Sequence, residues 1–365
     1  MKNTMKRKPV VAVLKTSPEG VIEDYHKLLS MLEYKKRLFN GADTLIKINL
    51  SWSLFFPACS TPPWQLEGVI KALIDDGLPR EKIIPCENRT VVTNVIKGCK
   101  ENKWFPIFRK YKVKFVPLTD VEWVRYEPKG EILALDKIFP DGHRIPKFFI
   151  GKNVIHLPTI KTHGHTTMTG AMKDAFGGLI TERRHHCHKM IHEVLVDLLQ
   201  IQKEIHPEIL AVMDGTVCGD GAGPRTMIPK IKGYILASFD QVAIDAVSAK
   251  MMGYDPMKIR FIKLAHDKGL GCGDVDQIEI VGEDISNVNF RFRTYRSPVI
   301  FGDQLFRKGL FRFVEPILFH TGLFNLCIFG SAFYHDYLWY PLIGKKRIKK
   351  FLETEWGKLW LRYEK

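Results

Sequence analysis

Lysine and histidine side chains gather where one predicted strand ends and a helix follows. The strand over residues 153–157 leads into Lys161, Thr162, His163, Gly164 and His165. An imidazole titrates near neutral pH, so His163 suits proton transfer, with His165 beside it. Lys161 and Lys173 would neutralise an anion, and Thr169 is the expected N-cap whose following N–H groups would help to hold it. We therefore predict a site for a small carboxylate or phosphate, although a solvated, capped turn would carry the same residues.

Four histidines follow within eight positions, and their spacing suggests metal chemistry. They are His185, His186, His188 and His192. If a helix begins here, His188 and His192 lie one turn apart on one face, a geometry that binds one divalent metal. The neighbouring Arg184 and Lys189 raise the cost of binding a cation. Metal binding by these four histidines and anion binding by the basic loop are thus alternative expectations.

A carboxylate and a run of glycines follow the next predicted strand. Residues 209–213 deliver Asp214 to a strand end, where it would act as a second catalytic carboxylate or a metal ligand. Glycines such as Gly221 and Gly223 let the backbone approach a ligand closely, so both are candidates for ligand contact. Pro224 interrupts the run, and no P-loop or Rossmann fingerprint is present, so a nucleotide is not indicated. A surface loop is the alternative.

Asp245 stands on a strongly apolar helical segment, residues 240–252. A buried carboxylate requires a partner. We expect a backbone donor or a lysine to bind it, in a structural role.

These side chains need a scaffold that brings strand ends together. Short apolar runs predict buried strands, and helical spacing fills the intervals between them. The predicted strands are 10–15, 44–50, 82–86, 113–116, 153–157, 209–213, 234–237 and 278–281, and the predicted helices 22–37, 64–76, 93–102, 240–252 and 255–268. The alternation predicts an α/β domain with a mostly parallel sheet and flanking helices, in which ligands bind at the carboxyl ends of the strands.

Charge and aromatic content divide the 365-residue chain unevenly. Lysine and arginine number 55 against 40 acidic residues, a formal charge of +15. Residues 290–365 hold 14 basic and 6 acidic residues and 19 of the 41 aromatic ones. We expect an α/β domain over 1–289, with 117–150 as an insertion or hairpin, and a basic, aromatic-rich helical or irregular extension over 290–365. No nucleic-acid-binding motif accompanies the charge, so nucleic acid is not the expected partner.

The extension contains the longest uncharged stretch of the chain. Residues 316–335 hold no Asp, Glu, Lys or Arg, but polar side chains dilute the stretch. It could pack on the core, cover the site as a lid, mediate homo-oligomerisation, or contact an anionic membrane weakly. Residues 1–9 lack an apolar signal-peptide core, and the seven cysteines form no C-x-x-C pair, so we expect a cytoplasmic protein, peripheral to a membrane if the extension binds one.

These motifs together resemble the DUF362 family, a domain of unknown function. The likeness spans roughly residues 40–285 and rests on Leu157 to His163, Thr169 to Asp174, Met213 to Gly215, Gly221 to Pro224, and Ser238 to Asp245. It implies an α/β domain of unsettled activity. Asp174 stands where the resemblance leads us to expect Asn. Some members carry a ferredoxin-type iron–sulfur module, whose cysteine repeats are absent here.

The sequence thus favours an enzyme that acts on a small anionic substrate, with Lys161, His163, Lys173 and Asp214 as catalytic residues and a divalent metal as the possible cofactor. The competing interpretation is a non-catalytic protein that binds a metal, an iron–sulfur cluster or a redox partner. A third is a peripheral membrane protein attached through its extension.

Overall fold

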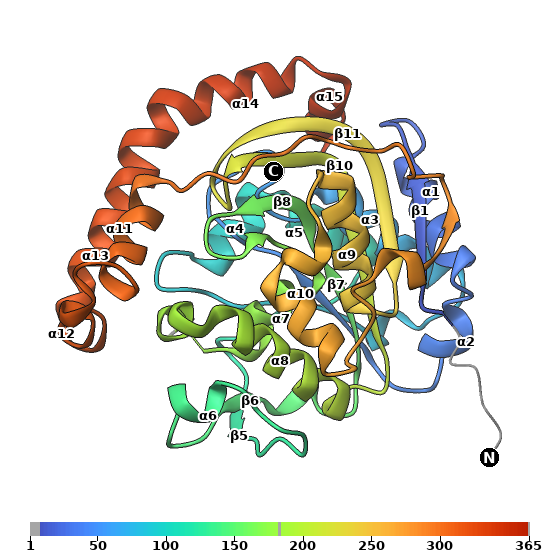
Figure 1. Cartoon of the computed structure of the whole chain (residues 1–365). Helices are drawn as coiled ribbons and strands as arrows, with labels where there is room; N and C mark the ends of the chain where they lie inside the picture. Colours follow the sequence, from blue (N-terminus) through green and yellow to red (C-terminus); the bar gives the residue numbers. More distant parts are fainter. Residues whose placement is uncertain (1–7, 182–183, 364–365) are drawn as a thin grey trace.

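The computed structural model describes residues 8–181 and 184–363. These form a central mixed sheet of ten strands flanked by helices, with a helical C-terminal region along one side (Figure 1). The expectation that residues 1–9 are no signal peptide falls mostly on residues outside the described part. The strands of the sheet are β1 (Val10–Lys15), β2 (Thr44–Ile48), β3 (Ile83–Glu87), β4 (Val116–Pro117), β7 (Asn153–Leu157), β8 (Thr159–His163), β9 (Thr167–Met168), β10 (Ile209–Ala222), β11 (Thr226–Ser238) and β12 (Glu279–Gly282).

The sheet is mostly parallel, as the alternating pattern predicted. Its order is β12-β1-β11-β10-β7-β2-β3-β4, with β8 paired to β10 and to β9. Strands β10, β7, β2, β3 and β4 run parallel to one another, and so do β1 and β12, whereas β11 is antiparallel to both of its neighbours. The carboxyl ends of β2, β3 and β7 therefore lie along one edge.

Helices cover both faces of the sheet, which explains why strands such as β1 and β7 are mostly apolar rather than alternating. In β1, Val11 and Val13 face one core while Ala12 faces the other. The first core is completed by α6 (Leu135–Ile138), α7 (Ala171–Leu179), α8 (Ile191–Ile205), α9 (Gln241–Met252) and α10 (Arg260–Asp267). The second is completed by α1 (Val21–Met31), α2 (Lys35–Leu38), α3 (Pro63–Asp75), α4 (Val95–Glu101) and α5 (Trp104–Tyr111).

Several boundaries differ from those predicted. The expected helix over residues 22–37 is two helices, because Glu33 adopts a positive φ of 48° between α1 and α2. The strand expected over residues 113–116 is reduced to β4. Short 3-10 helices fill several connections, namely η1 (Arg80–Lys82), η2 (Lys147–Phe149), η3 (Arg184–Met190), η4 (Pro256–Lys258) and η5 (Val275–Gln277).

The glycine-rich segment after Asp214 is a β-hairpin and not a loop. Strand β10 continues to Ala222 and pairs with β11 as far as Ala222 and Thr226. At the turn, a Cβ on Gly223 would lie 1.8 Å from the carbonyl oxygen of Thr162, so no other residue fits there without moving the backbone. The glycines thus allow the hairpin to pack closely against β8.

Residues 117–150 form a small unit beside the main sheet. Strands β5 (Trp123–Arg125) and β6 (Arg144–Pro146) pair antiparallel as a separate two-stranded sheet. Helix α6 lies between them in sequence, and its Leu135 is buried in the first core. The unit is therefore tied to the helical layer of α7 and α8.

The C-terminal region is helical and rich in aromatic contacts. Its helices are α11 (Pro298–Arg307), η6 (Arg312–Val314), α12 (Glu315–His320), α13 (Phe324–Ala332), the π-helical η7 (Phe333–Gly344), α14 (Lys345–Leu352) and α15 (Glu355–Arg362). Phe55 stacks on Trp360 with ring centroids 3.7 Å apart, and Trp64 lies 5.2 Å from Trp356. Trp52 contacts Trp339. These contacts fix α15 and η7 to the second core.

Within the described residues, no single helix is long and apolar enough to cross a bilayer. Two consecutive helical segments, residues 312–320 and 324–352, reach that length and composition together, but they are bent by 88° at the break between them. The 316–335 stretch therefore does not form one straight span.

Candidate functional site

A cavity of about 480 Å³ lies at the carboxyl ends of β2, β3 and β8. The α/β domain contributes charged and polar side chains to its lining: Lys47, Asn49, Glu87, His163, His165, Lys173, Asp174, Arg184, His185, His188 and Arg225. The C-terminal helices contribute the opposite wall, which includes Ile300, Asp303, Phe306, Phe319, Phe324 and Ile328. Two segments far apart in sequence thus enclose one space.

A buried charge network forms part of the cavity lining. Lys47 Nζ lies 2.9 Å from Glu87 Oε2 and 3.8 Å from Asp174 Oδ1, and all three side chains are buried. Burial lowers the pKa of Lys47, but the carboxylates of Asp174 and Glu87 outweigh it and raise that pKa. Asp174 also contacts Nδ1 of His156 at 3.0 Å. The acidic residue found where Asn was expected therefore balances Lys47, which leaves Lys47 satisfied.

Lys173 is the contrasting case, because its ammonium lines the cavity and no described carboxylate lies within ion-pair distance of it, although the charge of Asp174 still acts on it. Among the described residues it has no hydrogen bond or ion pair; its Nζ lies 5.5 Å from the ring centroid of Phe176. Burial, with Lys161 and Arg184 nearby, lowers its pKa from 10.5 to about 7. Lys173 can therefore exchange a proton near neutral pH or bind an anion.

Arg184 adds a second cation to the same cavity. Its guanidinium donates to the carbonyl oxygens of Gly177 at 2.8 Å and Arg89 at 3.1 Å. No ion pair with a carboxylate satisfies it within the described residues. Backbone carbonyls thus position the Arg184 charge without neutralising it.

The imidazoles of the cavity are held neutral. Burial, followed by the charge of Lys173, lowers the pKa of His163 well below 6.5. His163 Nδ1 accepts a hydrogen bond from the backbone N–H of His165 at 3.2 Å, so the neutral ring carries its proton on Nε2. Burial and Arg307 lower the pKa of His165 to about 3. His163 is therefore a hydrogen-bond donor, and Lys173 is better suited than His163 to exchange a proton near neutral pH.

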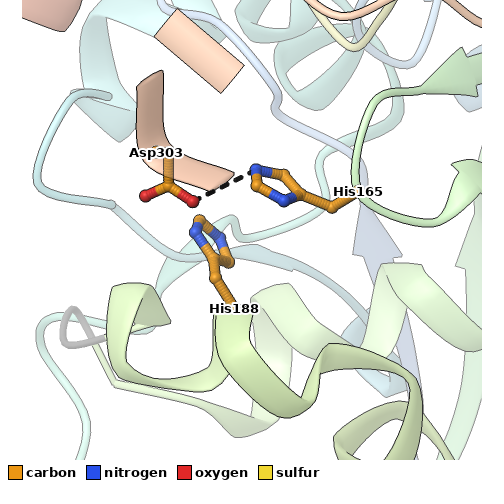
Figure 2. Close-up of side chains that lie close together, drawn as sticks. All are labelled: His165, His188 and Asp303. Carbon is orange, nitrogen blue, oxygen red and sulfur yellow. Dashed lines mark ion pairs between the residues drawn. The ribbon is translucent and has the colours of Figure 1, made fainter. Parts of the chain in front are cut away.

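Three side chains from different elements converge in this cavity (Figure 2). His165 follows β8, His188 belongs to η3, and Asp303 belongs to α11. His165 Nε2 and Asp303 Oδ2 are 3.7 Å apart, and candidate ligand atoms of all three lie within 4.8 Å of one another. Asp303 also pairs with Arg307 Nε at 2.9 Å. The three side chains form the one converging set of potential metal ligands in the described residues, and it includes no cysteine.

Two predicted catalytic residues lie outside this cavity. Lys161 is buried, and its Nζ donates to the carbonyl oxygen of Cys59 at 2.9 Å and to Thr159 at 2.7 Å. Asp214 is buried beneath the other face of the sheet, where Tyr25 donates to it at 2.7 Å and Trp64 at 3.1 Å. Both groups are thus hydrogen-bonded inside the core, away from the cavity lining.

The expected anion site at the start of α7 is already filled. The N-cap is Gly170, not Thr169, and Thr169 donates its hydroxyl to the carbonyl oxygen of Thr159 at 3.1 Å. The carboxylate of Asp245 accepts from the backbone N–H groups of Ala171 at 2.6 Å and Met172 at 3.1 Å. The prediction for Thr169 as N-cap was wrong, whereas the expected backbone partner of Asp245 is confirmed.

The remaining predicted residues are dispersed. Gly221 and Gly223 pack against Thr162 in the hairpin, outside the cavity lining, although Arg225 just beyond the turn reaches it. His192 belongs to a different element from His188, since η3 ends at Met190 and α8 begins at Ile191. The His192 ring lies 6.1 Å from that of Phe261. The predicted one-face pair of His188 and His192 is therefore wrong.

The other two histidines stay near the cavity wall. His185 lines the cavity and stacks on Phe324 with centroids 3.7 Å apart. The His186 ring is 4.6 Å from that of His320 and does not line the cavity. Of the four predicted metal ligands, only His188 joins the converging set.

Several cavity residues were not predicted as site residues, and their signals were weak. Lys47 stands inside an apolar predicted strand, where an unpaired lysine would be costly, so its position hinted at a buried partner. Glu87 follows the next strand, at the edge where ligands bind in such sheets. Asp303 is the one acidic residue between positions 290 and 314, which no spacing rule connects to His165.

Fold and site together define an α/β domain with a basic, histidine-lined cavity at its strand ends. The sequence matches the family described as "Domain of unknown function (DUF362)" over residues 44–250, and the chain belongs to this family.

A curated relative is "Thylakoid-associated protein sll1697" from Synechocystis sp. (strain ATCC 27184 / PCC 6803 / Kazusa), 28% identical over 181 residues. The match covers 46% of this chain and 56% of the relative, so the chain spans about half of that protein's length. A solved structure of a Thermotoga maritima protein is 11% identical, with a TM-score of 0.39, over 70% of this chain and 60% of that one.

Proposed function

We propose that this chain is an enzyme that acts on a small carboxylate or phosphate bound in the cavity. The main support is the position of Lys173, whose ammonium lies in the cavity wall with no carboxylate within ion-pair distance among the described residues. A partly buried cation without an ion-pair partner is costly, and a bound anion removes that cost. Arg184 supplies a second charge, and Nε2–H of His163 supplies a neutral donor.

Lys173 is also the group we propose for proton transfer. With its pKa lowered to about 7, it populates both the charged and the neutral form near neutral pH. His163, whose pKa lies well below 6.5, is then an orienting donor and not the acid or base. This assignment moves the proton-transfer role from His163 to Lys173, which also keeps the anion-binding role that the sequence suggested for it.

Thermal stabilisation by anions tests the proposal. A ligand that binds only the folded state raises its melting temperature. We expect inorganic phosphate or a small carboxylate such as pyruvate to stabilise the wild type, and Lys173→Met to abolish the effect while Lys173→Arg retains part of it. Lys203→Met, at an exposed position on α8, is the control. Equal stabilisation of wild type and Lys173→Met, or none of the wild type across a panel of anions, would contradict the proposal.

His165, His188 and Asp303 are the ligands we propose for a divalent metal of the zinc type. Two ligand atoms bound to one tetrahedral zinc lie about 3.4 Å apart, close to the 3.7 Å between His165 and Asp303. Neutral imidazoles are the metal-binding form, and the low pKa values of both histidines keep them so. One carboxylate leaves such a metal with net positive charge, which an anionic substrate would complement.

Metal titration separates this set from the other histidines. We expect Zn²⁺ to bind at one site per chain and His188→Gln to lose it, whereas the control His192→Gln keeps it. If the two variants bind Zn²⁺ alike, the assignment of His188 is wrong. Visible absorbance and iron in protein purified without a His-tag would support the competing iron–sulfur interpretation, in which scattered cysteines such as Cys59, Cys218 and Cys272 would bind the cluster. Metal binding without turnover would support the non-catalytic one.

A second function, attachment to a membrane surface, is favoured by the outer side of α13 and η7. We define the outer stripe as Leu323, Leu326, Phe329, Phe333 and Tyr337, which recur at helical spacing and are between 46% and 75% exposed. The same helix continues into α14, whose exposed Lys345, Lys346, Lys349 and Lys350 have no ion-pair partner among the described residues. Exposed apolar and basic side chains on one helix suit an anionic bilayer. The thylakoid association in the relative's name points the same way.

Co-sedimentation with vesicles tests this attachment. We expect binding to phosphatidylserine-containing vesicles that weakens with salt, and its loss in Leu326→Gln/Phe329→Gln. The control Ile96→Gln/Ile150→Gln removes two other exposed apolar side chains and should still bind. Equal binding by both double variants would refute attachment through the stripe, and so would self-association without vesicle binding.

A further inference from the structure

The wall that the C-terminal helices give to the cavity is mostly apolar, with Asp303, Ser331 and His335 as its polar members. Ile300 and Phe306 of α11, Phe319 of α12, and Phe324 and Ile328 of α13 all line it. A small hydrophilic anion would leave these side chains facing water. The ligand that fits this wall therefore carries apolar surface of its own.

The acidic group and the apolar surface would be bound at different parts of the lining. Lys173 and Arg184 come from the α/β domain, and most of the large apolar side chains come from the C-terminal helices. His185, stacked on Phe324 at 3.7 Å, joins the two parts. The lining thus has a basic part and an apolar part, the division found in an amphiphile.

Helix α13 separates the cavity from the surroundings by the thickness of one helix. Phe324 and Ile328 line the cavity, whereas Leu326 and Phe329 of the same helix are 65% and 69% exposed. Figure 1 shows α12 and α13 at one end of the molecule, away from the sheet. An apolar chain would meet apolar side chains on both sides of this helix, as it would when passing from a bilayer into the cavity.

We infer that the anion bound by this cavity is the head of an amphiphile, a carboxylate or phosphate on an alkyl or prenyl chain. Lys173 and Arg184 bind the acid group, and the chain lies along Phe319, Phe324 and Ile328. This inference rests on the proposed function, because it assigns the substrate class of the same site. A bilayer under the outer stripe is the source of the ligand.

A chain-length series of monomeric alkyl phosphates tests the inference by titration calorimetry. Each buried methylene strengthens binding by about fourfold, which corresponds to about 0.8 kcal/mol. From ethyl to octyl phosphate we expect the affinity to rise by at least about 100-fold, since six methylenes are added and part of the chain stays exposed. Octyltrimethylammonium, with the same chain and the opposite charge, should not bind.

Two variants of α13 separate the cavity side from the outer side. Ile328→Gln should lower the affinity for octyl phosphate by about tenfold or more and leave ethyl phosphate unchanged. Leu326→Gln, whose side chain points outward, should change neither. Because α13 has no fully buried residue, both variants should fold.

The outcomes separate this inference from the proposed function. Equal affinities for ethyl and octyl phosphate would overturn the amphiphile and leave the anion site standing. No binding of either would overturn both. Octyl phosphate that binds Lys173→Met as tightly as wild type would also overturn the inference, because the acid group would then not be recognised.

Discussion

Replacing Lys173 by methionine should stabilise the protein at neutral and acidic pH. The unfolded chain holds this proton with a pKa of 10.5, and the folded protein with a pKa of about 7. Each pKa unit corresponds to about 1.4 kcal/mol, so the buried charge costs at most about 5 kcal/mol below pH 7. Because the ammonium faces a cavity and is only partly buried, we expect a cost of about 3 to 5 kcal/mol.

The sign of the pH dependence follows from proton linkage. Between pH 7 and 10.5 the unfolded state binds a proton at this position that the folded state has released, so the wild type gains stability as the pH rises. From pH 6.5 to 9 it should gain about 1 to 3 kcal/mol relative to Lys173→Met. The advantage of the variant is therefore largest at pH 6.5 and shrinks at pH 9.

Urea denaturation at pH 6.5 and 9 provides the measurement. Comparing the variant with the wild type at each pH cancels the groups that both proteins share. The exposed Lys203→Met is the control and should differ from wild type by the same amount at both pH values. If Lys173→Met shows a pH-independent difference as well, Lys173 is not held in the environment described, and the reasoning about an unpaired cation fails.

The remaining predictions concern ligand affinity and the elements that shape the cavity. Anion affinity should fall about 20-fold from pH 6.5 to 8.5, because the charged form of Lys173, which binds the anion, declines above pH 7. If calorimetry finds the same affinity at both pH values, Lys173 is not the partner of the anion. Asp245→Ala should lower the free energy of unfolding by about 3 kcal/mol, since it leaves the N–H groups of Ala171 and Met172 buried and unbonded; urea denaturation measures this loss. Gly223→Ala should cost at least about 3 kcal/mol in the same assay, because its Cβ would overlap the carbonyl of Thr162, while Gly302→Ala, with no atom within 4 Å of the added Cβ, should be near neutral. Trp356→Ala should cost about 3 to 5 kcal/mol by removing a buried contact with Trp64, against less than about 0.5 kcal/mol for the exposed Leu361→Ala.

The fold was predictable where one residue pattern allows one structure. Apolar runs such as 10–15 and 153–157 are buried on both faces, and both are strands at the predicted bounds. Asp245 was predictable for a related reason, since a carboxylate within an apolar helix must find a donor. In both cases burial determines what a residue must contact, and buried segments can be recognised in the sequence by their runs of apolar residues.

The site was less predictable because its residues meet only after folding. The spacing of His188 and His192 suggested one helix face, but η3 ends between them, and His188 meets Asp303, 115 positions away. The glycine run suggested a loop, but close packing against Thr162, not flexibility, explains its composition. Long-range convergence of this kind has no local periodicity from which it could be inferred.

Only one of the two walls of the cavity lies within the part of the chain that matches the family. The family match ends at residue 250, whereas Asp303, Phe319, Phe324 and Ile328 all follow it. The family match thus includes the strand ends with their lysines and histidines, which form one wall of the cavity. The opposite wall comes from residues that follow the match. A change confined to residues 298–335 would alter the shape of the cavity and leave the wall formed by the α/β domain unchanged. Proteins that share this domain can therefore differ in ligand selectivity through changes in the C-terminal helices alone.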